Sequence, residues 1–394
     1  MTEKALNKTE LRAGLGLGLV LAFRMLGLFL IVPVFSLLAR DLEGQTPLLI
    51  GLAIGIYGLA QALLQQPFGH LSDRIGRRPV LLFGLSLFVL GGIVAAYSTT
   101  INGIILGRAI QGCGAVASVA LALAGDITRP ASRSIVMAII GMGIGAAFLL
   151  SILISVPLAT LLGLQGLFVL TAILGLVAIA LVFWVVPAAP AILVITDGPS
   201  PEVTAGPGVH AHVPLWVLNI GIFVLHASMT MLFINFPRLL EQEHQWFLVE
   251  HWKLYVPTMM ISAVIVFPLL RKIGRESLTV SSLAWILLLQ SVGMITLILT
   301  GSMPLVFIAL SLYFLSFNLQ EALFPAQVSI LAAEGNRGKV MGRYTTFQFL
   351  GSFAGGILGG LLLGQFGYDG ALWFMAVTTL VWFIVLLGFS RSTK

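Results

Sequence analysis

The chain has 394 residues, of which 58% are apolar and only 9% are charged. Soluble domains carry about 25% charged residues and cannot bury so much apolar surface, so the composition excludes a water-soluble protein. The net charge of +6 does not indicate nucleic-acid binding, because the basic residues fall in short loops between apolar runs. Cys113 is the single cysteine, which excludes an internal disulfide, and no metal site is expected.

Apolar runs of membrane-crossing length repeat along the whole chain. A membrane helix needs about 20 apolar residues. We therefore predict an all-α membrane protein with twelve transmembrane helices at 14–38, 47–69, 79–98, 101–124, 134–158, 164–186, 214–236, 254–270, 278–300, 304–326, 340–363 and 368–390. The first run is too long for a signal peptide. The eighth is the shortest, and Trp252 and Tyr255 suit a membrane interface just before it.

The spans fall into two sets of six. The stretch between the sixth and seventh spans is rich in Pro, Gly and Ala and contains no Lys or Arg, which is typical of a linker. We predict an N-terminal six-helix bundle at 1–187, a cytoplasmic linker at 188–213 and a C-terminal six-helix bundle at 214–394. Asp73-Arg-Ile-Gly-Arg77 follows the second span and Arg271-Lys-Ile-Gly-Arg275 follows the eighth, as a duplicated, pseudo-symmetric bundle predicts.

The basic residues indicate which side of the membrane each loop faces. Sixteen Lys and Arg residues fall on the side of the two termini, and three (Arg40, Arg238 and Lys253) fall on the opposite side. Cytoplasmic loops carry an excess of Lys and Arg. The sequence therefore predicts a multi-pass protein of a bacterial inner membrane, with both termini in the cytoplasm.

Glu321 is the only acidic residue deep inside a predicted span. It shares a helical face with Asn318 and Pro325, and the proline frees a backbone carbonyl one turn earlier. An acid inside the membrane is costly and marks a functional site by default, so we expect Glu321 to take up and release protons. The alternative is a permanently protonated carboxyl that only hydrogen-bonds a neighbouring helix.

Other polar residues inside the spans are candidates for proton coupling or substrate contact. For proton coupling we add His226, Arg108 in the fourth span and Asp126 at its inner end, because imidazole titrates near neutral pH and intramembrane charges need a purpose. For the substrate cavity we add Arg24, Asn219 and Asn318. The alternatives are a structural hydrogen bond for His226 and pairing with an acid across the cavity for Arg24.

Glycines recur at intervals of four residues in two predicted spans. The eleventh span carries two such series, and the second span carries a shorter one: Gly351, Gly355 and Gly359; Gly356, Gly360 and Gly364; Gly51 and Gly55. Glycine faces let helix backbones approach closely. They fit either sliding helices or static packing seams.

The string Gly69-His-Leu-Ser-Asp-Arg-Ile-Gly-Arg-Arg78 resembles motif A of the major facilitator superfamily, and it lies between spans 2 and 3, where that motif belongs. Ile105–Ala115, which includes Arg108, resembles motif B. Val156-Pro157 stands where the antiporter motif C has glycine and proline, so that motif is degraded here. More closely, LAFRMLGLFLIVPV, IGIYGLAQALLQQPFGHLSDRIGRRP, IILGRAIQGCGA and FNLQEALFPA resemble the YajR-type branch of proton-driven drug efflux proteins.

The resemblance implies a conformational latch built from motif A, with Gly69, Asp73, Arg74, Gly76, Arg77 and Arg78. We expect Asp73 to lie against the N-terminus of the eleventh span near Gly338–Met341, where backbone N–H groups favour an anion, and Arg77 to pair with Asp126. YajR-type proteins usually continue into a C-terminal cytoplasmic domain, whereas this chain ends at Lys394 directly after the last span. We expect a monomer.

Together these features predict a proton-coupled exporter of small, largely apolar compounds, a drug:H⁺ antiporter that works by alternating access and needs no cofactor beyond the proton motive force. Its partners would be a small-molecule substrate, protons and the lipid bilayer. An importer or facilitator of a small metabolite is the first alternative, because importers also carry motif A. An enzyme, receptor or channel is the second; an enzyme would need a nucleophile with its base or a metal-ligand cluster, and the sequence shows neither.

Overall fold

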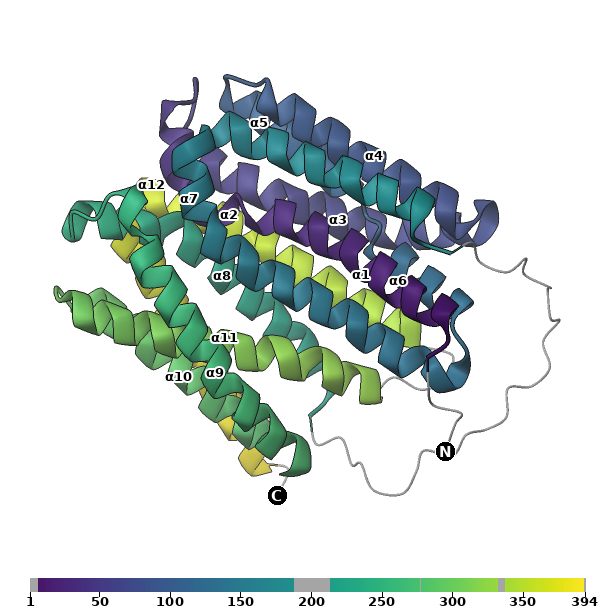
Figure 1. Ribbon diagram of the computed structural model, residues 1–394. Helices are drawn as coiled ribbons and strands as arrows, with labels where there is room; N and C mark the ends of the chain where they lie inside the picture. Colours follow the sequence, from purple (N-terminus) through teal and green to yellow (C-terminus); the bar gives the residue numbers. More distant parts are fainter. Residues whose placement is uncertain (1–5, 188–212, 277, 332–336, 393–394) are drawn as a thin grey trace.

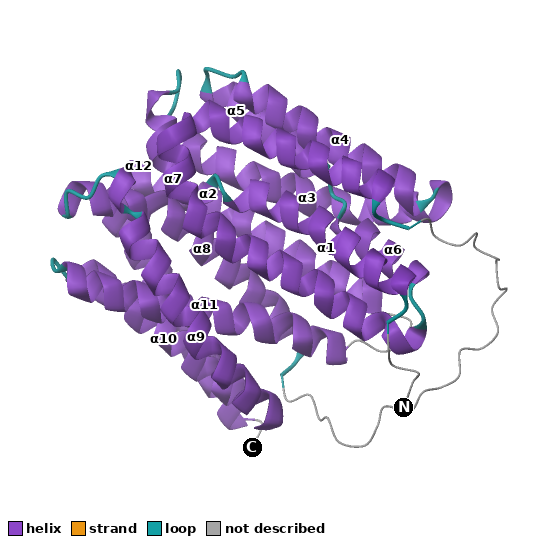
Figure 2. Ribbon diagram, viewed as in Figure 1, coloured by secondary structure: helices purple, strands orange, loops and turns teal. Residues whose placement is uncertain are grey.

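The computed structural model describes residues 6–187, 213–276, 278–331 and 337–392, and these residues are almost entirely helical (Figures 1 and 2). The predicted linker at 188–213 lies outside the described residues except for Val213. The main helices are α1 (Lys8–Phe29), α2 (Val32–Leu38), α3 (Pro47–Ile75), α4 (Arg77–Ala96), α5 (Ile101–Cys113), α6 (Ala117–Ile127), α7 (Pro130–Trp184), α8 (Leu215–Glu243), α9 (Trp252–Glu276), α10 (Val280–Leu299), α11 (Met303–Leu331) and α12 (Arg337–Ser392). Two short 3₁₀ helices, η1 (Ala39–Asp41) and η2 (Leu248–Glu250), follow α2 and precede α9.

Polar caps set several helix starts. The Asn7 side chain accepts a hydrogen bond from the Glu10 backbone, and the Glu10 carboxylate accepts one from the Asn7 backbone, which makes a capping box. The hydroxyls of Thr46, Thr100 and Thr279 accept backbone N–H groups at the starts of α3, α5 and α10. These caps explain why the spans begin at polar residues between apolar runs.

Two helices are twice the length of a membrane span. α7 has 55 residues and α12 has 56, and each turns at one glycine, Gly163 (φ 65°) or Gly367 (φ 70°). A positive φ is readily adopted only by glycine, so the chain can reverse there. The described residues contain ten helices long and apolar enough to span a membrane. Counting α7 and α12 as two crossings each gives the twelve predicted transmembrane segments.

The eighth predicted span is shorter than the helix that the structure shows. The sequence suggests 254–270, whereas α9 runs from Trp252 to Glu276. Polar residues at both ends of α9 lower the local hydropathy, so an apolar-run criterion underestimates the length of the helix.

The helices pack in two groups that meet along two seams. α1 to α7 pack mainly on one another, as do α8 to α12, while α3 packs along α12 and α2 packs on α8. Glycines permit the first seam: a Cβ added to Gly51 would lie 2.1 Å from the Gly356 oxygen, and one added to Gly356 would lie 2.5 Å from the Gly51 oxygen. The glycine series therefore mark real close approaches.

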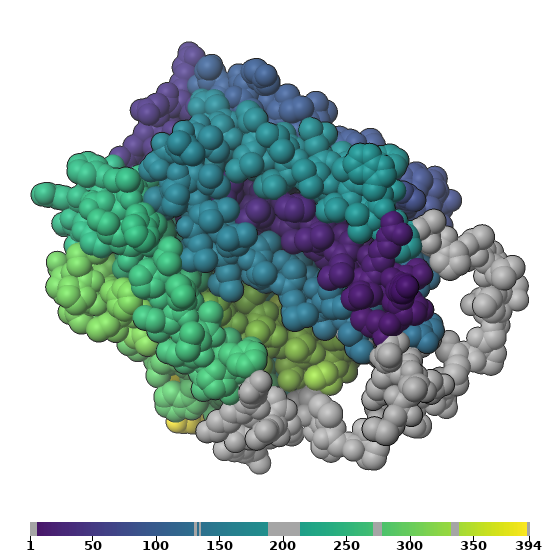
Figure 3. Space-filling view, in the orientation of Figure 1, coloured from purple at the N-terminus to yellow at the C-terminus, as the bar shows by residue number. Residues whose placement is uncertain are grey.

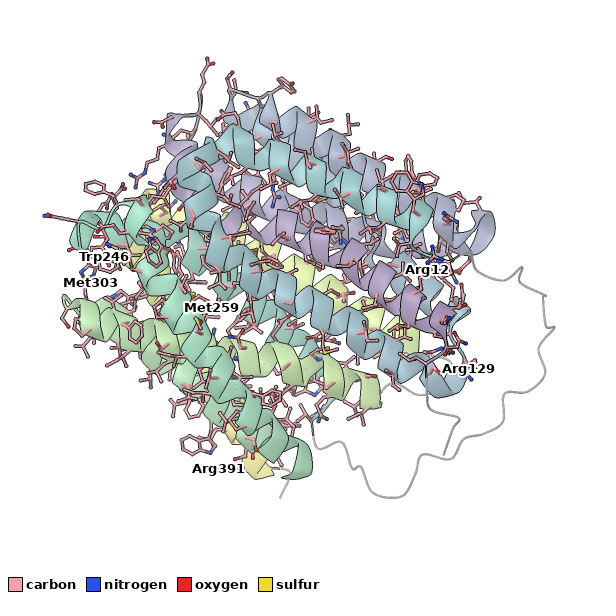
Figure 4. The ribbon with its side chains drawn as sticks, viewed as in Figure 1. Arg12, Arg129, Trp246, Met259, Met303 and Arg391 are labelled. Carbon is pink, nitrogen blue, oxygen red and sulfur yellow. The ribbon has the colours of Figure 1, made fainter. Side chains whose placement is uncertain are left out.

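The two ends of the bundle differ. Figure 4 places Arg12 and Arg129 at one end and Trp246 and Met303 at the other. We call the first the basic end, since motif A also lies there, and the second the far end. α7 and α9 lie near each other at the far end and diverge toward the basic end (Figure 1). In the space-filling view, atoms of α11 are visible between those of α7 and α9 (Figure 3).

Candidate functional site

A first polar cluster lies inside the N-terminal group of helices. Arg24 of α1 is completely buried, and its Nη2 donates hydrogen bonds to the hydroxyl of Tyr57 (2.7 Å) and to the side-chain oxygen of Gln61, both on α3. The guanidinium carbon of Arg24 lies 5.9 Å from the centre of the Tyr57 ring. The partners of Arg24 are thus neutral groups, and the acid that the sequence analysis offers as an alternative is not among them.

Arg108 of α5 extends this first cluster. It is buried, its guanidinium carbon lies 4.8 Å from the centre of the Tyr57 ring, and its Nη1 donates to Gln111 (3.2 Å). Gln111 in turn donates to Thr171 of α7 (3.1 Å). One tyrosine therefore lies against two buried guanidinium groups, an arrangement that the π face of the ring stabilises.

A second polar cluster lies inside the C-terminal group and joins three helices. His226 Nε2 of α8 is 3.1 Å from Glu321 Oε2 of α11, and the Gln348 amide of α12 donates to His226 Nε2 (2.8 Å) and to Glu321 Oε1 (3.3 Å). Ser352, one turn after Gln348, places its hydroxyl 3.5 Å from His226 Nδ1. The imidazole is buried, whereas 38% of the Glu321 side chain is exposed.

The hydrogens of this second cluster have two consistent arrangements. If Glu321 is protonated, its O–H and the Gln348 amide both donate to a lone pair on His226 Nε2. If Glu321 is ionised, His226 Nε2 carries the proton and donates to the carboxylate, and the Gln348 N–H must leave the ring and donate to Glu321 Oε1 alone. The His226–Glu321 contact can therefore hold its proton on either residue once Gln348 reorients.

The second cluster faces the boundary between the two helix groups. Phe317, one turn before Glu321 on the same face of α11, stacks on Phe148 of α7 with ring centres 5.6 Å apart, and Phe148 meets Phe29 of α1 at 4.8 Å. On the other side, a Cβ at Gly58 would touch Ser352, which itself contacts His226. Glu321 therefore lies at the central boundary and not in a dry seam away from it.

The motif A residues occupy the basic end, at the turn from α3 to α4. Gly69 is in α3, Arg74 is exposed in its last turn, and Gly76 has φ 99°, which favours glycine. Arg77 pairs with Asp73 and with Asp126 (3.0 Å), the second contact being the one that the sequence predicts. Arg78 donates to the backbone oxygens of Val182 (2.8 Å) and Phe183 (2.9 Å).

The structure leaves some sequence-predicted residues outside both clusters. Asp126 is exposed at the basic end beside Arg77, and its role in proton coupling remains a prediction. Asn318 donates to Ser262 of α9 (2.8 Å), and Asn219 is buried on α8, seven residues before His226. The assignment of these two asparagines to a substrate cavity also remains a prediction. Among the described residues, no group of three or more His, Cys, Asp or Glu is placed to hold a metal ion.

The sequence analysis missed polar contacts that join the two helix groups at the far end. Arg40 of η1 forms an ion pair with Glu241 of α8, Arg238 donates to the Ser36 oxygen (3.3 Å), and the Ser36 hydroxyl donates to the Phe233 oxygen (3.4 Å). Arg40 and Arg238 are both among the three basic residues predicted for this side. Their isolated position, on a side with few basic residues, is the sequence feature that could have indicated these contacts. Toward the basic end, Gln65 donates to Thr345 (2.6 Å) across the α3–α12 seam.

Two bundles of membrane helices with buried charges at their boundary define the architecture of a secondary transporter. The family model described as Major Facilitator Superfamily matches residues 17–355, and the chain belongs to this family. It is therefore a multi-pass membrane transporter of small molecules and not an enzyme, and the all-helical fold with two groups of six crossings is the fold of that family.

Known proteins support this assignment. The inner membrane transport protein YajR of Escherichia coli is 38% identical over 392 residues, which cover 98% of this chain and 85% of that protein. The multidrug resistance protein MdtH of Aeromonas hydrophila is 28% identical over 359 residues (89% and 87%). The crystal structure of a bacterial homologue of the human lysosomal transporter Spinster, in an inward-facing and occupied conformation, has a TM-score of 0.77 at 15% identity, covering 98% and 97% of the two chains. The similarity to YajR agrees with the branch that the sequence motifs suggest.

Proposed function

We propose that this protein exports small, largely apolar compounds from a bacterial cell in exchange for protons, as a monomer in the inner membrane with both termini in the cytoplasm. The single observation that carries the proposal is the Glu321–His226–Gln348 cluster. It places an acid from within a predicted span at the central boundary, partly exposed, beside an imidazole that can share its proton. The name of one relative, a multidrug resistance protein, is in keeping with export.

We infer alternating access because the two helix groups are in closer contact at one end of the bundle than at the other. The Arg40–Glu241 ion pair and the two Ser36 hydrogen bonds hold the helix groups together at the far end, whereas α7 and α9 diverge at the basic end. In this proposal the structure corresponds to a state in which α7 and α9 are apart at the basic end. Protonation of Glu321 removes one negative charge from the boundary, and a charge change that differs between two conformations shifts their populations.

Motif A supplies the opposing latch at the basic end. Gln65 of α3 contacts Thr345 of α12, and Asp73 follows Gln65 by eight residues while Thr345 follows the start of α12 at Arg337 by eight. Because the two helices run antiparallel, this register brings Asp73 toward the first turn of α12, where an anion is stabilised. Arg77 would orient Asp73, and Asp126 would hold Arg77 in place. In this proposal the latch holds α3 against α12 at the basic end.

The proposal is tested by Glu321→Gln in sealed proteoliposomes with an imposed pH gradient. Transport would be measured for a lipophilic cation, an uncharged lipophilic compound, an organic anion and a sugar. We expect gradient-driven transport of the accepted compound to fall by at least about tenfold, because the amide cannot carry a proton. Exchange of the same compound without a gradient should persist.

The control is Glu243→Gln, which removes an acid that accepts a hydrogen bond from Tyr368 at the far end. It should leave gradient-driven transport within twofold of the unmodified protein. Unchanged proton-driven transport by the Glu321→Gln variant would overturn the proposed role of Glu321. Accumulation of substrate together with protons, instead of in exchange for them, would identify an importer.

A further inference from the structure

The buried cluster around Arg24 contains hydrogen-bond donors without acceptors. Nε and Nη1 of Arg24 and the amide nitrogen of Gln61 are buried and have no partner among the described residues. Arginine has no acceptor atom, and an amide nitrogen only donates. All three groups therefore lack the same thing, an acceptor. Leaving such donors buried and unpaired is unfavourable, and more so for a charged group.

The charges at the centre of the protein also lack a partner. In the described part of the chain, neither Arg24 nor Arg108 has a carboxylate within ion-pair distance. Both guanidinium groups stay protonated in a protein. With Glu321 ionised and His226 neutral, the charged side chains of the two clusters sum to +1. One additional negative charge would balance this sum and relieve the cost of the buried positive charge.

We propose that Arg24 and Gln61 bind the acidic group of an organic anion, a carboxylate, sulfonate or phosphate ester attached to an apolar body. Nε and Nη1 of Arg24 can each donate to an oxygen of an acidic group, while Nη2 already donates to Tyr57 and Gln61. The surroundings fit the apolar body, because Leu28, Tyr57 and Phe88 form a buried cluster on which Met25 and Phe349 pack. This inference rests on the proposed export function and names the class of compound that it handles.

The site also adjoins the route that substrate must use. Tyr57, which bonds Arg24, is followed by Gly58, and Gly58 lies against the backbone of Phe349 on α12. Separation of α3 from α12 would therefore uncover Tyr57 and the guanidinium behind it. An anion bound there would meet side chains of both helix groups, since Phe349 belongs to the C-terminal group.

The test compares three probes that share one apolar body: 2-naphthoate, 2-naphthamide and (2-naphthylmethyl)ammonium. Equilibrium dialysis would measure their binding to the full chain in nanodiscs at pH 7, without any gradient. We expect naphthoate to bind at least about tenfold more tightly than the amide, as a hydrogen-bonded charge pair implies, and the ammonium to bind weakest. Equal binding of the three probes, or a preference for the ammonium, would overturn the proposal. Displacement of naphthoate by an equal concentration of inorganic phosphate would overturn the requirement for an apolar body.

Two variants test whether the preference for naphthoate over naphthamide arises at Arg24 and Gln61. Arg24→Gln should abolish the tenfold difference between naphthoate and naphthamide. Gln61→Glu should abolish it as well, because it places a carboxylate of the chain beside Arg24, and the new ion pair should raise the unfolding temperature. Arg133→Gln is the matched control, since Arg133 is exposed at the basic end and donates to the Gly125 oxygen. Survival of the preference in Gln61→Glu would overturn the assignment even if Arg24→Gln fails to fold.

Failure here is distinguishable from failure of the export proposal. Glu321→Gln should retain the naphthoate preference while losing gradient-driven transport, because the donors proposed to bind the acidic group belong to Arg24 and Gln61 and not to the Glu321 cluster. If the preference is absent but proton-driven export is present, the protein is an exporter of another class of compound.

Discussion

The two buried polar clusters differ in charge, exposure and hydrogen-bond balance. Around Arg24 and Arg108 the charges are positive, both guanidinium groups are shielded from solvent, and several donors lack acceptors. Around Glu321 and His226 the ionisable groups are a carboxyl and an imidazole, the carboxyl is partly exposed, and each of its oxygens has a partner. The first cluster consists of fixed donors, whereas the second contains a carboxyl and an imidazole in hydrogen-bond contact.

This difference assigns separate tasks to the two halves of a duplicated fold. A fixed positive charge suits recognition, since it stays constant through the cycle. An exchangeable proton suits energy coupling, since its presence alters the charge at the central boundary. The two clusters approach each other across the α3–α12 seam, where Gly58 lies against Ser352 and Ser352 contacts His226. A change in one cluster can therefore reach the other through a few contacts.

Moving the acid from the Glu321 cluster to the Arg24 cluster should have the largest effect on transport. In the double variant Glu321→Gln with Gln61→Glu, the number of carboxyl groups is unchanged, but the new one lies beside Arg24. An acid paired with arginine stays ionised, so it cannot exchange protons near neutral pH. We expect gradient-driven transport to fall by at least about a hundredfold, measured in proteoliposomes. Recovery of more than a tenth of the original rate would show that the position of the acid is unimportant.

Neutralising the ion pair at the far end should have a smaller effect. Arg40 and Glu241 are both partly exposed, and such pairs contribute about 1 kcal/mol or less. Glu241→Gln should therefore raise the population open at the far end by up to about fivefold. Spin labels at Glu43 and Gln242, in a Cys113→Ser background, would report the distance distribution across that end.

The matched control for this pair is Glu250→Gln. Glu250 pairs with Lys253 (3.2 Å) at the same end of the molecule, but both residues belong to the C-terminal group. Its neutralisation should leave the distances unchanged. The exchanged pair Arg40→Glu with Glu241→Arg should restore the original distance distribution. A shift in Glu250→Gln equal to that in Glu241→Gln would argue against a specific role for the Arg40–Glu241 pair.

Neutralising Asp73 should have the smallest effect and the opposite sign. A charge at a helix N-terminus contributes about 0.3–1 kcal/mol, so Asp73→Asn should lower the population closed at the basic end by about twofold to fivefold. Labels at Arg133 and Arg391, both exposed at that end, would measure it. Asp41→Asn, at the far end, serves as the control. A shift toward the closed form in Asp73→Asn would contradict the latch.

The sequence predicted contacts that belong to a family motif and turns that lie between neighbouring spans. The Arg77–Asp126 pair followed from motif A, and the turns at Gly163 and Gly367 fall between predicted spans. The sequence did not indicate a role for Gln348, because a glutamine in a membrane helix has no distinctive pattern until its neighbours are known. The contact between His226 and Glu321 joins residues 95 positions apart, so no local pattern could reveal it.

The sequence by itself determined the number of crossings, the basic side and the single deep acid, because hydropathy and charge are properties of each residue and its near neighbours. Only the tertiary structure decided which buried polar groups meet. Arg24 came to lie against Tyr57 and Gln61 without an acid, and Glu321 against His226 and Gln348, because helices distant in the chain pack side by side. That packing depends on the glycine seam between α3 and α12 and on the complementary shapes of many side chains at once.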